Sequence, residues 1–458
     1  MTDNSSFTFD IGEAITPLDG RNMHKLKKLR QFYSDFILTK YRVKLEIEYL
    51  IKLSRYKVIR KLTKQETITM YQYIKIFNFE DYKRVREIEK RTNHEAKSAE
   101  EYVKKKLMTT SLSDVAQMIH FGLTSDDINN LAYGLIIKNV VNQVFFPELK
   151  LILRSLKESA RKYKNLSMLS RTHGQPAAPT TMGKEYLVYY KRLKDEVEML
   201  KNLKIRGKLT GNTGNFNAHQ FIFPKLDWLK FSQDFVSSLD LEPDLITTQI
   251  EPYDSLIRLF QVLLRINNIL LGLSIDFWFY ISLGYFKQKL IKKEVGSTAM
   301  PHKINPIYFE GSEGGFGIAN SLLEFYCRKL SYSRLQRDLS DSTVRRSFGV
   351  AFGYSLLSYQ SINEALNRIE ADRDSIKEDL NKHLEVVSEA IQNFLRTKNY
   401  SDAYDKTKVF FRGREVNSES IKKFIESLKI GEEDKKKLIE LYPENYTGLA
   451  EKIVTKFI

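Results

Sequence analysis

The sequence predicts an all-α protein. Residues 18–146 and 307–442 contain no proline, so both stretches can form long helices, whose interiors proline disrupts. Apolar residues inside them recur every three or four positions, as in Leu131–Val144 and again in 356–366. Alternation of apolar and polar residues, which is typical of strands, is almost absent. These observations favour a bundle of long helices.

One segment departs from this pattern. Lys208–Asn217 is rich in Gly, Asn and Thr, and we expect it to form a loop or a short hairpin. The chain divides along its length into three expected domains. These are a helical N-terminal domain (1–110), a central domain of long helices with prolines at its turns (111–369), and a charged, Tyr- and Lys-rich C-terminal domain (370–458).

Length and composition fit a soluble, globular protein with a large core. The chain has 458 residues, of which 42% are hydrophobic and 28% charged. Its first ten residues are polar and do not resemble a secretory signal. The only cysteine, Cys327, excludes an internal disulfide and fits a reducing cytoplasm. We interpret it as a filler of the core or of an interface, with a catalytic nucleophile as the alternative.

The most apolar stretch is Ile266–Phe286. Asn267, Asn268 and Asp276 interrupt it, so it lacks the uncharged span of about 18 residues that a transmembrane helix needs. A helix that is apolar on most faces is commonly buried in a bundle or between subunits. We therefore expect a buried bundle helix here.

The chain is basic, with 73 Lys and Arg against 57 Asp and Glu and a net charge of +16. Nucleic-acid binding is one interpretation, because clustered cations displace counterions from phosphates. The basic residues are, however, spread along the chain among acidic ones. We favour a solvated, lysine-rich surface whose positive potential attracts an anionic small molecule.

The motif with the clearest chemistry is Gly296–Pro306 (GSTAMPHKINP). It suits removal of a proton next to a carboxylate, which leaves a dianionic intermediate that Lys303 and Asn305 can stabilise. Ser297 can serve as the base only where the site favours its alkoxide, which requires cations nearby and exclusion of water. A turn that caps the following helix is the alternative.

A second motif, Ser170–Pro176 (SRTHGQP), places His173 in a Gly/Pro turn, from which it can reach a ligand. An imidazolium is well suited to protonate a departing amine near neutral pH. A hydrogen-bonded structural histidine is the alternative. No Cys/His spacing suits zinc, and neither a P-loop nor a dinucleotide fingerprint is present. We therefore expect chemistry without a metal or an organic cofactor.

The third motif is Thr124–Asn130 (TSDDINN), at the start of a helical pattern. Ser125 or Asp126 is expected to cap this helix. Because the N-terminus of a helix attracts anions, the same residues can hold a substrate carboxylate. The two roles are compatible.

Scattered residues complete a set of candidate anion ligands. Guanidinium groups bind phosphate and carboxylate in a bidentate manner, although each of these residues alone is equally a surface charge. The candidates are Arg21, which follows a turn, Asn93 and His94, and the cluster of Arg337, Ser342, Arg345 and Arg346 in Gln336–Arg346.

Together these motifs resemble those of the fumarase/aspartase superfamily. Its signature loop is G-S-S-x-M-P-x-K-x-N, and this chain has GSTAMPHKIN, with Thr298 in place of the second serine. Within the superfamily the chain is similar to the bacterial adenylosuccinate lyases. The similarity runs from about Thr16 to near the C-terminus and rests on the segments RTNHEAK, TSDDINNL, LSRTHGQPA, TTQIEPYD and RLQRDLSDST.

The resemblance implies a three-domain, all-α fold in which the long helices of four subunits form a twenty-helix bundle. It implies a cytoplasmic homotetramer whose active sites combine residues of three subunits. It also implies two fumarate-releasing reactions of purine synthesis, without cofactor or metal. Adenylosuccinate would give AMP, and succinylaminoimidazole-carboxamide ribotide (SAICAR) would give AICAR.

The resemblance further implies roles for residues. Ser297 would be the general base, His173 the general acid, and Lys303 a third catalytic residue that also binds carboxylate. The succinyl carboxylates would be held by Lys303 together with Thr124, Ser125, Thr172, Gln249 and Asn305. The nucleotide would be held by Arg21, His94, Arg337, Ser342 and Arg346. Asn22, Asn93, Glu95 and Met300 complete the expected substrate-binding set.

Three positions depart from the family pattern. Asn22 replaces a tyrosine, Glu95 an aspartate and Tyr253 a histidine, so contacts with the nucleotide are expected to differ there. Two alternatives stay open. One is another lyase of the superfamily, such as argininosuccinate lyase, and the other is a non-catalytic helical scaffold or nucleic-acid-binding protein on the same fold.

Overall fold

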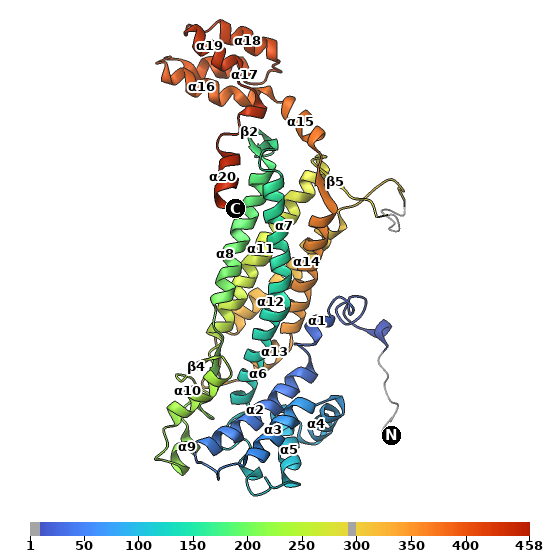
Figure 1. The fold of residues 1–458 in the computed structure, drawn as a ribbon, viewed down its shortest axis with the longest axis vertical. Helices are drawn as coiled ribbons and strands as arrows, with labels where there is room; N and C mark the ends of the chain where they lie inside the picture. Colours follow the sequence, from blue (N-terminus) through green and yellow to red (C-terminus); the bar gives the residue numbers. More distant parts are fainter. Residues whose placement is uncertain (1–9, 292–298) are drawn as a thin grey trace. The chain divides into compact units, whose positions relative to one another are not determined.

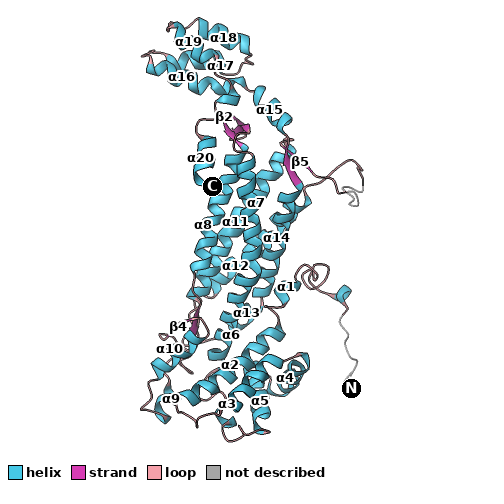
Figure 2. Cartoon of the chain, viewed as in Figure 1, coloured by secondary structure: helices cyan, strands magenta, loops and turns pink. Residues whose placement is uncertain are grey.

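The computed structural model describes residues 10–291 and 299–458 and is mostly helical, as predicted (Figures 1 and 2). The chain forms two compact units. Unit 1 comprises Met1–Leu149, Glu196–Asn267 and Gly314–Ser358; unit 2 comprises Lys150–Asp195, Asn268–Glu313 and Tyr359–Ile458. The expected division into 1–110, 111–369 and 370–458 is a division along the sequence and stays a prediction.

Five long helices have residues in both units. They are α7 (Phe146–Lys162), α8 (Met182–Asn202), α11 (Asp254–Ser282), α12 (Ile307–Lys329) and α14 (Phe348–Arg368).

The other elements of unit 1 are mostly helices. They are η1 (Ile11–Glu13), α1 (Lys27–Arg30), α2 (Asp35–Arg55), α3 (Lys64–Ile76), α4 (Phe79–Thr92), α5 (Glu95–Met108), η2 (Ala116–Met118), α6 (Ser125–Val140), η3 (Val141–Phe145), β3 (Arg206–Lys208), α9 (Asn217–Ile222), α10 (Trp228–Ser238), β4 (Glu242–Asp244) and α13 (Ser340–Arg346).

Unit 2 adds two antiparallel strand pairs and a group of short helices, of which α16 to α19 gather together in Figure 1. Its elements are β1 (Ser167–Thr172), β2 (Gln175–Thr181), β5 (Phe286–Gln288), β6 (Ile369–Ala371), α15 (Arg373–Asn381), η4 (Leu384–Val387), α16 (Ser388–Thr397), α17 (Ala403–Phe411), α18 (Ser418–Glu426), α19 (Glu432–Ile439), η5 (Pro443–Asn445) and α20 (Ala450–Phe457).

Local sequence explains where the helices of the N-terminal region begin. Thr63 and Glu66 form a capping box at α3, with the Thr63 hydroxyl 3.1 Å from the Glu66 nitrogen and the Glu66 carboxylate 2.8 Å from the Thr63 nitrogen. Asn78 and Asp81 do the same at α4. Each cap satisfies N–H groups that lack helical partners and contributes about 1 kcal/mol.

The junction between α6 and α7 has a visible cause. The periodic segment Leu131–Val144 is helical, as predicted, but its last residues belong to a π-helical turn, η3. Pro147 follows at the second position of α7. Its ring cannot tolerate the carbonyl four residues earlier in α-helical geometry, and a π-turn widens the helix at that point.

Aromatic side chains form much of the core in each unit. In unit 1, Phe260 packs against Phe348 and Tyr326, with ring centroids 5.0 and 5.7 Å apart. In unit 2, Phe277 packs against Tyr186 at 5.0 Å and Phe286 at 5.2 Å. Fully buried aromatic rings of this kind supply a large share of the hydrophobic stabilisation.

Helix α11 contains the apolar stretch that we expected to be buried. It has the length and composition to cross a membrane, with a mean hydropathy of 1.5 in its most apolar window, but 61% of that window is buried inside the molecule. Its Asn267 is fully buried and donates hydrogen bonds to Asn320 and Ser355 at 3.0 and 3.2 Å. Packing and internal hydrogen bonds of this kind support the interpretation as a core helix.

The strands are short and appear in magenta in Figure 2. Residues 209–216 form a loop, as expected for Lys208–Asn217, and only the ends of the segment differ: Lys208 ends strand β3, which pairs in parallel with β4, and Asn217 begins α9. The β1–β2 hairpin was not predicted at all. Its second strand contains Pro176 and Pro179, which a two-stranded sheet tolerates because one side of each strand needs no partner.

A buried ion pair in unit 1 generates a prediction about stability. His120 Nδ1 lies 2.6 Å from Oε1 of the fully buried Glu46. Burial lowers the pKa of His120, but the carboxylate of Glu46, together with those of Glu100 and Asp127, raises it to about 9. Because the folded pKa exceeds the unfolded value, the pair stabilises fully below pH 6.5 and loses its effect as the pH rises through 9.

Glu46→Gln should therefore lower the free energy of unfolding by roughly 3 kcal/mol at pH 6, and by much less above pH 9. Denaturant titrations between pH 6 and 10 measure this difference. His120→Asn, whose side chain tolerates the left-handed backbone at φ 62°, should abolish the pH-dependent part. A loss in Glu46→Gln that is constant with pH would contradict the assignment.

Candidate active site

Thr124 and Ser125 lie at the N-terminus of α6, as the sequence predicted. Thr124 is the N-cap, with an extended backbone, and Ser125 is the first helical residue. The expectation that Ser125 or Asp126 caps the helix was wrong: Asp127 reaches back and accepts a hydrogen bond from the Thr124 nitrogen at 2.9 Å. The positive end of a 16-residue helix thus lies next to two half-buried side chains that bear hydroxyls, which suits a carboxylate.

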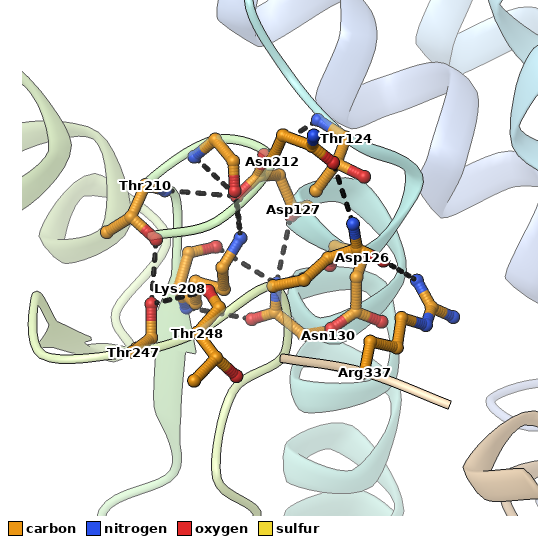
Figure 3. A network of polar contacts seen from close by, with 12 residues as sticks. Thr124, Asp126, Asp127, Asn130, Lys208, Thr210, Asn212, Thr247, Thr248 and Arg337 are labelled. Atoms are coloured by element: carbon orange, nitrogen blue, oxygen red, sulfur yellow. Dashed lines mark hydrogen bonds and ion pairs between the residues drawn. The ribbon is translucent and has the colours of Figure 1, made fainter. Parts of the chain in front are cut away.

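Behind this helix start, Asp127 is fully buried and paired with Lys208 (Figure 3). The Lys208 ammonium lies 2.7 Å from Asp127 Oδ1 and 2.8 Å from the Gly211 carbonyl. The same carboxylate oxygen accepts the backbone N–H groups of Thr210 and Gly211 at 3.0 and 3.3 Å. Asn130 bonds with both backbone groups of Lys208. The 208–211 segment is therefore fixed against α6.

Gln249 and Arg337, which the sequence placed 88 residues apart, are in contact in the structure. Arg337 Nη1 donates to Gln249 Oε1 at 3.3 Å, and Gln249 Nε2 donates to Asn212 Oδ1 at 2.7 Å. The amide of Gln249 is oriented from both sides. Asn212 is a member of this cluster that sequence analysis missed, since it lies in a segment that we predicted only to be a loop.

The 208–217 segment also lies close to the segment that carries Gln249. The hydroxyls of Thr210 and Thr247 are 2.8 Å apart. Gly214 has φ 82°, and a Cβ atom there would lie 2.0 Å from the Thr247 carbonyl, so no other residue fits. The Gly- and Asn-rich composition thus permits a close approach of two backbones beside the candidate site.

Helix α13 carries the arginine cluster, and its two adjacent arginines have different surroundings. Arg345 is 2% exposed and pairs with Asp126 and Asp341. Arg346 is exposed and pairs with Glu95. The expectation of anion binding is therefore wrong for Arg345, whose guanidinium faces buried carboxylates, whereas Arg346 lies where a ligand can reach it.

Glu95, the residue that replaces the family's aspartate, lies between Arg346 and Arg42 and pairs with both. Partial burial alone would raise the pKa of the Glu95 carboxyl, but the two arginines keep it below its ordinary value. Glu95 therefore stays ionised and holds Arg346. Ser342 is half-buried on the same short helix α13 as Arg346.

Tyr253, the third departure from the family pattern, has a buried side chain, and its effect on contacts with the nucleotide stays a prediction. Its side chain is 2% exposed, and its hydroxyl donates to Asp341 at 2.5 Å. Tyr253 thus belongs to the interior behind the site.

The remaining candidates of unit 1 lie in turns. Asn93 ends α4 in the left-handed conformation at φ 48°, and the exposed His94 begins α5, its Nδ1 accepting from Lys97 N–H at 3.2 Å. A neutral His94 therefore carries its hydrogen on Nε2. Arg21 is exposed and Asn22 half-buried in the turns before α1.

In unit 2, His173 lies at the tip of the β1–β2 hairpin. Thr172 pairs with Gln175, and His173 and Gly174 between them have φ 54° and 75°, a pattern typical of a type I′ turn. Thr172 and His173 are both exposed. The hairpin thus presents the imidazole to solvent, as an acid that protonates a ligand requires.

The base of this hairpin is fixed by Arg171. Its guanidinium bonds to both oxygens of Asp379, at 2.8 and 3.1 Å, and to the Tyr285 hydroxyl at 3.0 Å. Arg171, from the same motif as His173, is therefore a bracing residue rather than a ligand-binding one.

The signature loop is described only in part. Ser297 lies outside the described residues. Lys303 and Asn305 line a cavity of about 320 Å³ in unit 2. Met300, which precedes the lining residue Pro301 in the chain, is 47% exposed. Gln288 fixes the loop at this point by donating to the Ile304 carbonyl at 2.8 Å. Lys303 is exposed, so its ammonium can meet an anion.

No three His, Cys, Asp or Glu side chains within 10–291 and 299–458 are grouped so that they could hold a metal ion. The expectation of chemistry without metal or cofactor stays a prediction.

Comparisons with known proteins agree with the motifs. The family model described as "Lyase" matches residues 21–317, and the model described as "Adenylosuccinate lyase C-terminal" matches 333–447. The chain is 44% identical to an adenylosuccinate lyase of Legionella pneumophila (strain Corby), covering 97% of this chain and 98% of the relative. It is 40% identical to the adenylosuccinate lyase of Escherichia coli (strain K12), covering 95% and 97%.

Solved structures show the same fold. A fumarate lyase from Mesorhizobium sp. BNC1 superimposes with a TM-score of 0.78 at 18% identity, over 94% of this chain and 97% of that one. Identity at this level bears on the fold, whereas the sequence matches over nearly full length bear on the family. This chain belongs to the adenylosuccinate lyases, a family of the fumarase/aspartase superfamily of lyases.

Proposed function

We propose that this chain eliminates fumarate from adenylosuccinate to give AMP, and from SAICAR to give AICAR. The observation that carries the proposal is 44% identity to an adenylosuccinate lyase over 97% of the chain, with the acid, base and lysine positions of the motifs occupied. The substrate is polyanionic, which fits the positively charged side chains that we propose as ligands in each unit.

In the proposed reaction, Ser297 removes a proton from the carbon next to a succinyl carboxylate. The resulting negative charge is delocalised into that carboxylate, where Lys303 and Asn305 stabilise it. His173 then protonates the departing nitrogen. Its exposed position at a hairpin tip supports this role.

The residues proposed to bind the substrate form two groups, one for the succinyl carboxylates and one for the nucleotide. Thr124, Ser125 and Gln249 hold the second succinyl carboxylate at the N-terminus of α6, together with Thr172. Arg21, His94, Arg337, Ser342 and Arg346 hold the nucleotide and its phosphate, supported by Asn22, Asn93, Glu95 and Met300. The Glu95–Arg346 pair means that a phosphate has to share Arg346 with a carboxylate.

The assembly is also a proposal. Four chains would form a cytoplasmic homotetramer with a twenty-helix bundle, and each active site would combine residues of three subunits.

Absorbance assays test the reaction directly. Adenylosuccinate should be converted to AMP and fumarate, while argininosuccinate should not react. Turnover of argininosuccinate without reaction of adenylosuccinate would contradict the proposal. Retention of RNA at physiological salt, with no lyase activity, would instead favour a nucleic-acid-binding protein.

Mixing of inactive variants tests the shared site. Ser297→Ala and His173→Ala should each lower kcat by about two to four orders of magnitude, since each removes a proton-transfer group. Because the two residues should come from different chains, random exchange of subunits should restore up to about a quarter of wild-type activity. No recovery despite proven subunit exchange would contradict the three-subunit model.

Asn212→Ala tests the cluster around Gln249. Without its partner the Gln249 amide loses one of its two orienting bonds, so KM for adenylosuccinate should rise roughly five-fold with little change in kcat. Asn215→Ala is the matched control, because this exposed residue of the same segment donates only to Thr213 in the described contacts. Equal effects of the two variants on KM would show that Gln249 is not oriented by Asn212.

A further inference from the structure

Arg345 is too deeply buried to touch a ligand. It is nevertheless surrounded by the segments that carry the proposed substrate ligands. Its side chain is 2% exposed. Nη1 lies 2.8 Å from Asp126 Oδ1, and Nη2 lies 3.0 Å from Asp341 Oδ2. A buried guanidinium with two carboxylates is a geometrically demanding arrangement, because each ionic partner has lost its water.

Aromatic side chains complete the surroundings of this guanidinium. Its central carbon lies 5.3 Å from the ring centre of Tyr133 and 5.7 Å from that of Tyr253. The Tyr253 hydroxyl donates to the same Asp341 oxygen that Arg345 contacts. The Arg345 carbonyl accepts from the Tyr33 hydroxyl at 3.1 Å. The group is thus restrained from four parts of unit 1.

Tyr253 is itself held in a strained conformation. Its φ of 64° is left-handed, which is unusual for a bulky aromatic residue. Two contacts restrain it: the hydroxyl on Asp341, and the backbone N–H, which donates to Glu251 at 2.8 Å. Strained residues persist where the surroundings over-determine them, and they are common near functional sites. Tyr253 follows Gln249 by four residues, so this restraint also fixes the Gln249 segment.

Three of the contacts with Arg345 lead to segments with proposed substrate ligands. Asp126 directly follows Ser125, Asp341 directly precedes Ser342, and Tyr253 ends the segment that begins at Gln249. These segments carry the proposed ligands Ser125, Ser342 and Gln249. A further proposed ligand, Arg346, directly follows Arg345 in the sequence.

Charge explains why a cation is required at this position. The carboxylates of Asp126 and Asp341 are both buried and face Arg345 from two directions. Burial, reinforced by nearby carboxylates including Asp126, raises the pKa of Glu251 to about 8. Glu251 is then protonated at neutral pH, so it adds no further negative charge to the group.

We propose that Arg345 is a positioning residue for substrate binding, whose buried guanidinium sets the relative placement of three ligand-bearing segments. The proposal rests on the proposed function, because the substrate is what those segments hold. A positioning role can be told from a purely structural one by the effect of losing Arg345. The loss should weaken the binding of substrate and product more than it slows proton transfer.

The experiment measures KM and kcat for adenylosuccinate, and the dissociation constant of AMP by calorimetry, in folded tetramers. Arg345→Met should raise KM and the AMP dissociation constant by roughly ten-fold or more, with kcat changed by less than about three-fold. Arg345→Lys should recover part of the affinity, because it keeps the positive charge but lacks the planar guanidinium that can bond to two carboxylates. Tyr253→Phe removes one hydroxyl only, should fold, and should raise both constants by a few-fold.

Arg60→Met is the matched control. Arg60 also holds two carboxylates, Glu66 and Asp114, but none of its partners adjoins a proposed ligand, so it should lower stability without changing either constant. Wild-type affinity in folded Arg345→Lys and Tyr253→Phe would overturn the inference. Failure of the wild-type protein to bind AMP or to turn over adenylosuccinate would instead overturn the proposed function.

Discussion

Two adjacent buried aspartates at the start of α6 are the constraint on which this site depends. Asp126 pairs with Arg345 and Asp127 with Lys208, and all four side chains are almost completely buried. Such carboxylates are tolerated only with a partner, since an unpaired buried charge costs several kcal/mol. Successive residues on a helix point about 100° apart. The two pairs therefore fix two different segments against one helix end.

The two ion pairs fix the helix end at which we propose that a substrate carboxylate binds. The carboxylates suit the first turn of the helix, where negative charge is favourable, and their cations neutralise them away from the ligand. The first N–H groups of the helix and the hydroxyls of Thr124 and Ser125 are the groups that we propose hold the substrate, whereas the Asp127 N–H already donates to the Thr124 carbonyl at 3.0 Å. A site built this way needs no rearrangement of its binding groups when the carboxylate arrives.

The same 100° step between successive helix residues separates the two adjacent arginines of α13. Arg345 turns inward to the aspartates, while Arg346 turns outward to Glu95, which also holds Arg42. The glutamate at position 95 has a longer arm than the family's aspartate and contacts both arginines. The replacement of the family's aspartate by Glu95 is thus accompanied by ion pairs of Glu95 with Arg346 and Arg42.

The fold was largely predictable and the supporting contacts were not. Proline-free stretches and helical periodicity predict long helices because both reflect local backbone geometry. The segments that carry the proposed ligands were singled out because their residue types match chemistry and a known family. The partners Lys208 and Asn212 were missed, since nothing local shows that Lys208 meets Asp127 on a helix 81 positions away or that Asn212 meets Gln249, 37 positions away. Nor can sequence tell which of two adjacent arginines is buried, because the answer depends on how a seven-residue helix is rotated.

The most direct test of the account is a crystal structure of the Ser297→Ala variant with adenylosuccinate bound. The account predicts a succinyl carboxylate at the N-terminus of α6, bonded to Thr124 or Ser125, with Gln249 beside it and Arg345 still on Asp126 and Asp341. A substrate whose carboxylates both lie away from α6, or an Arg345 side chain that turns out to meet the ligand, would contradict it.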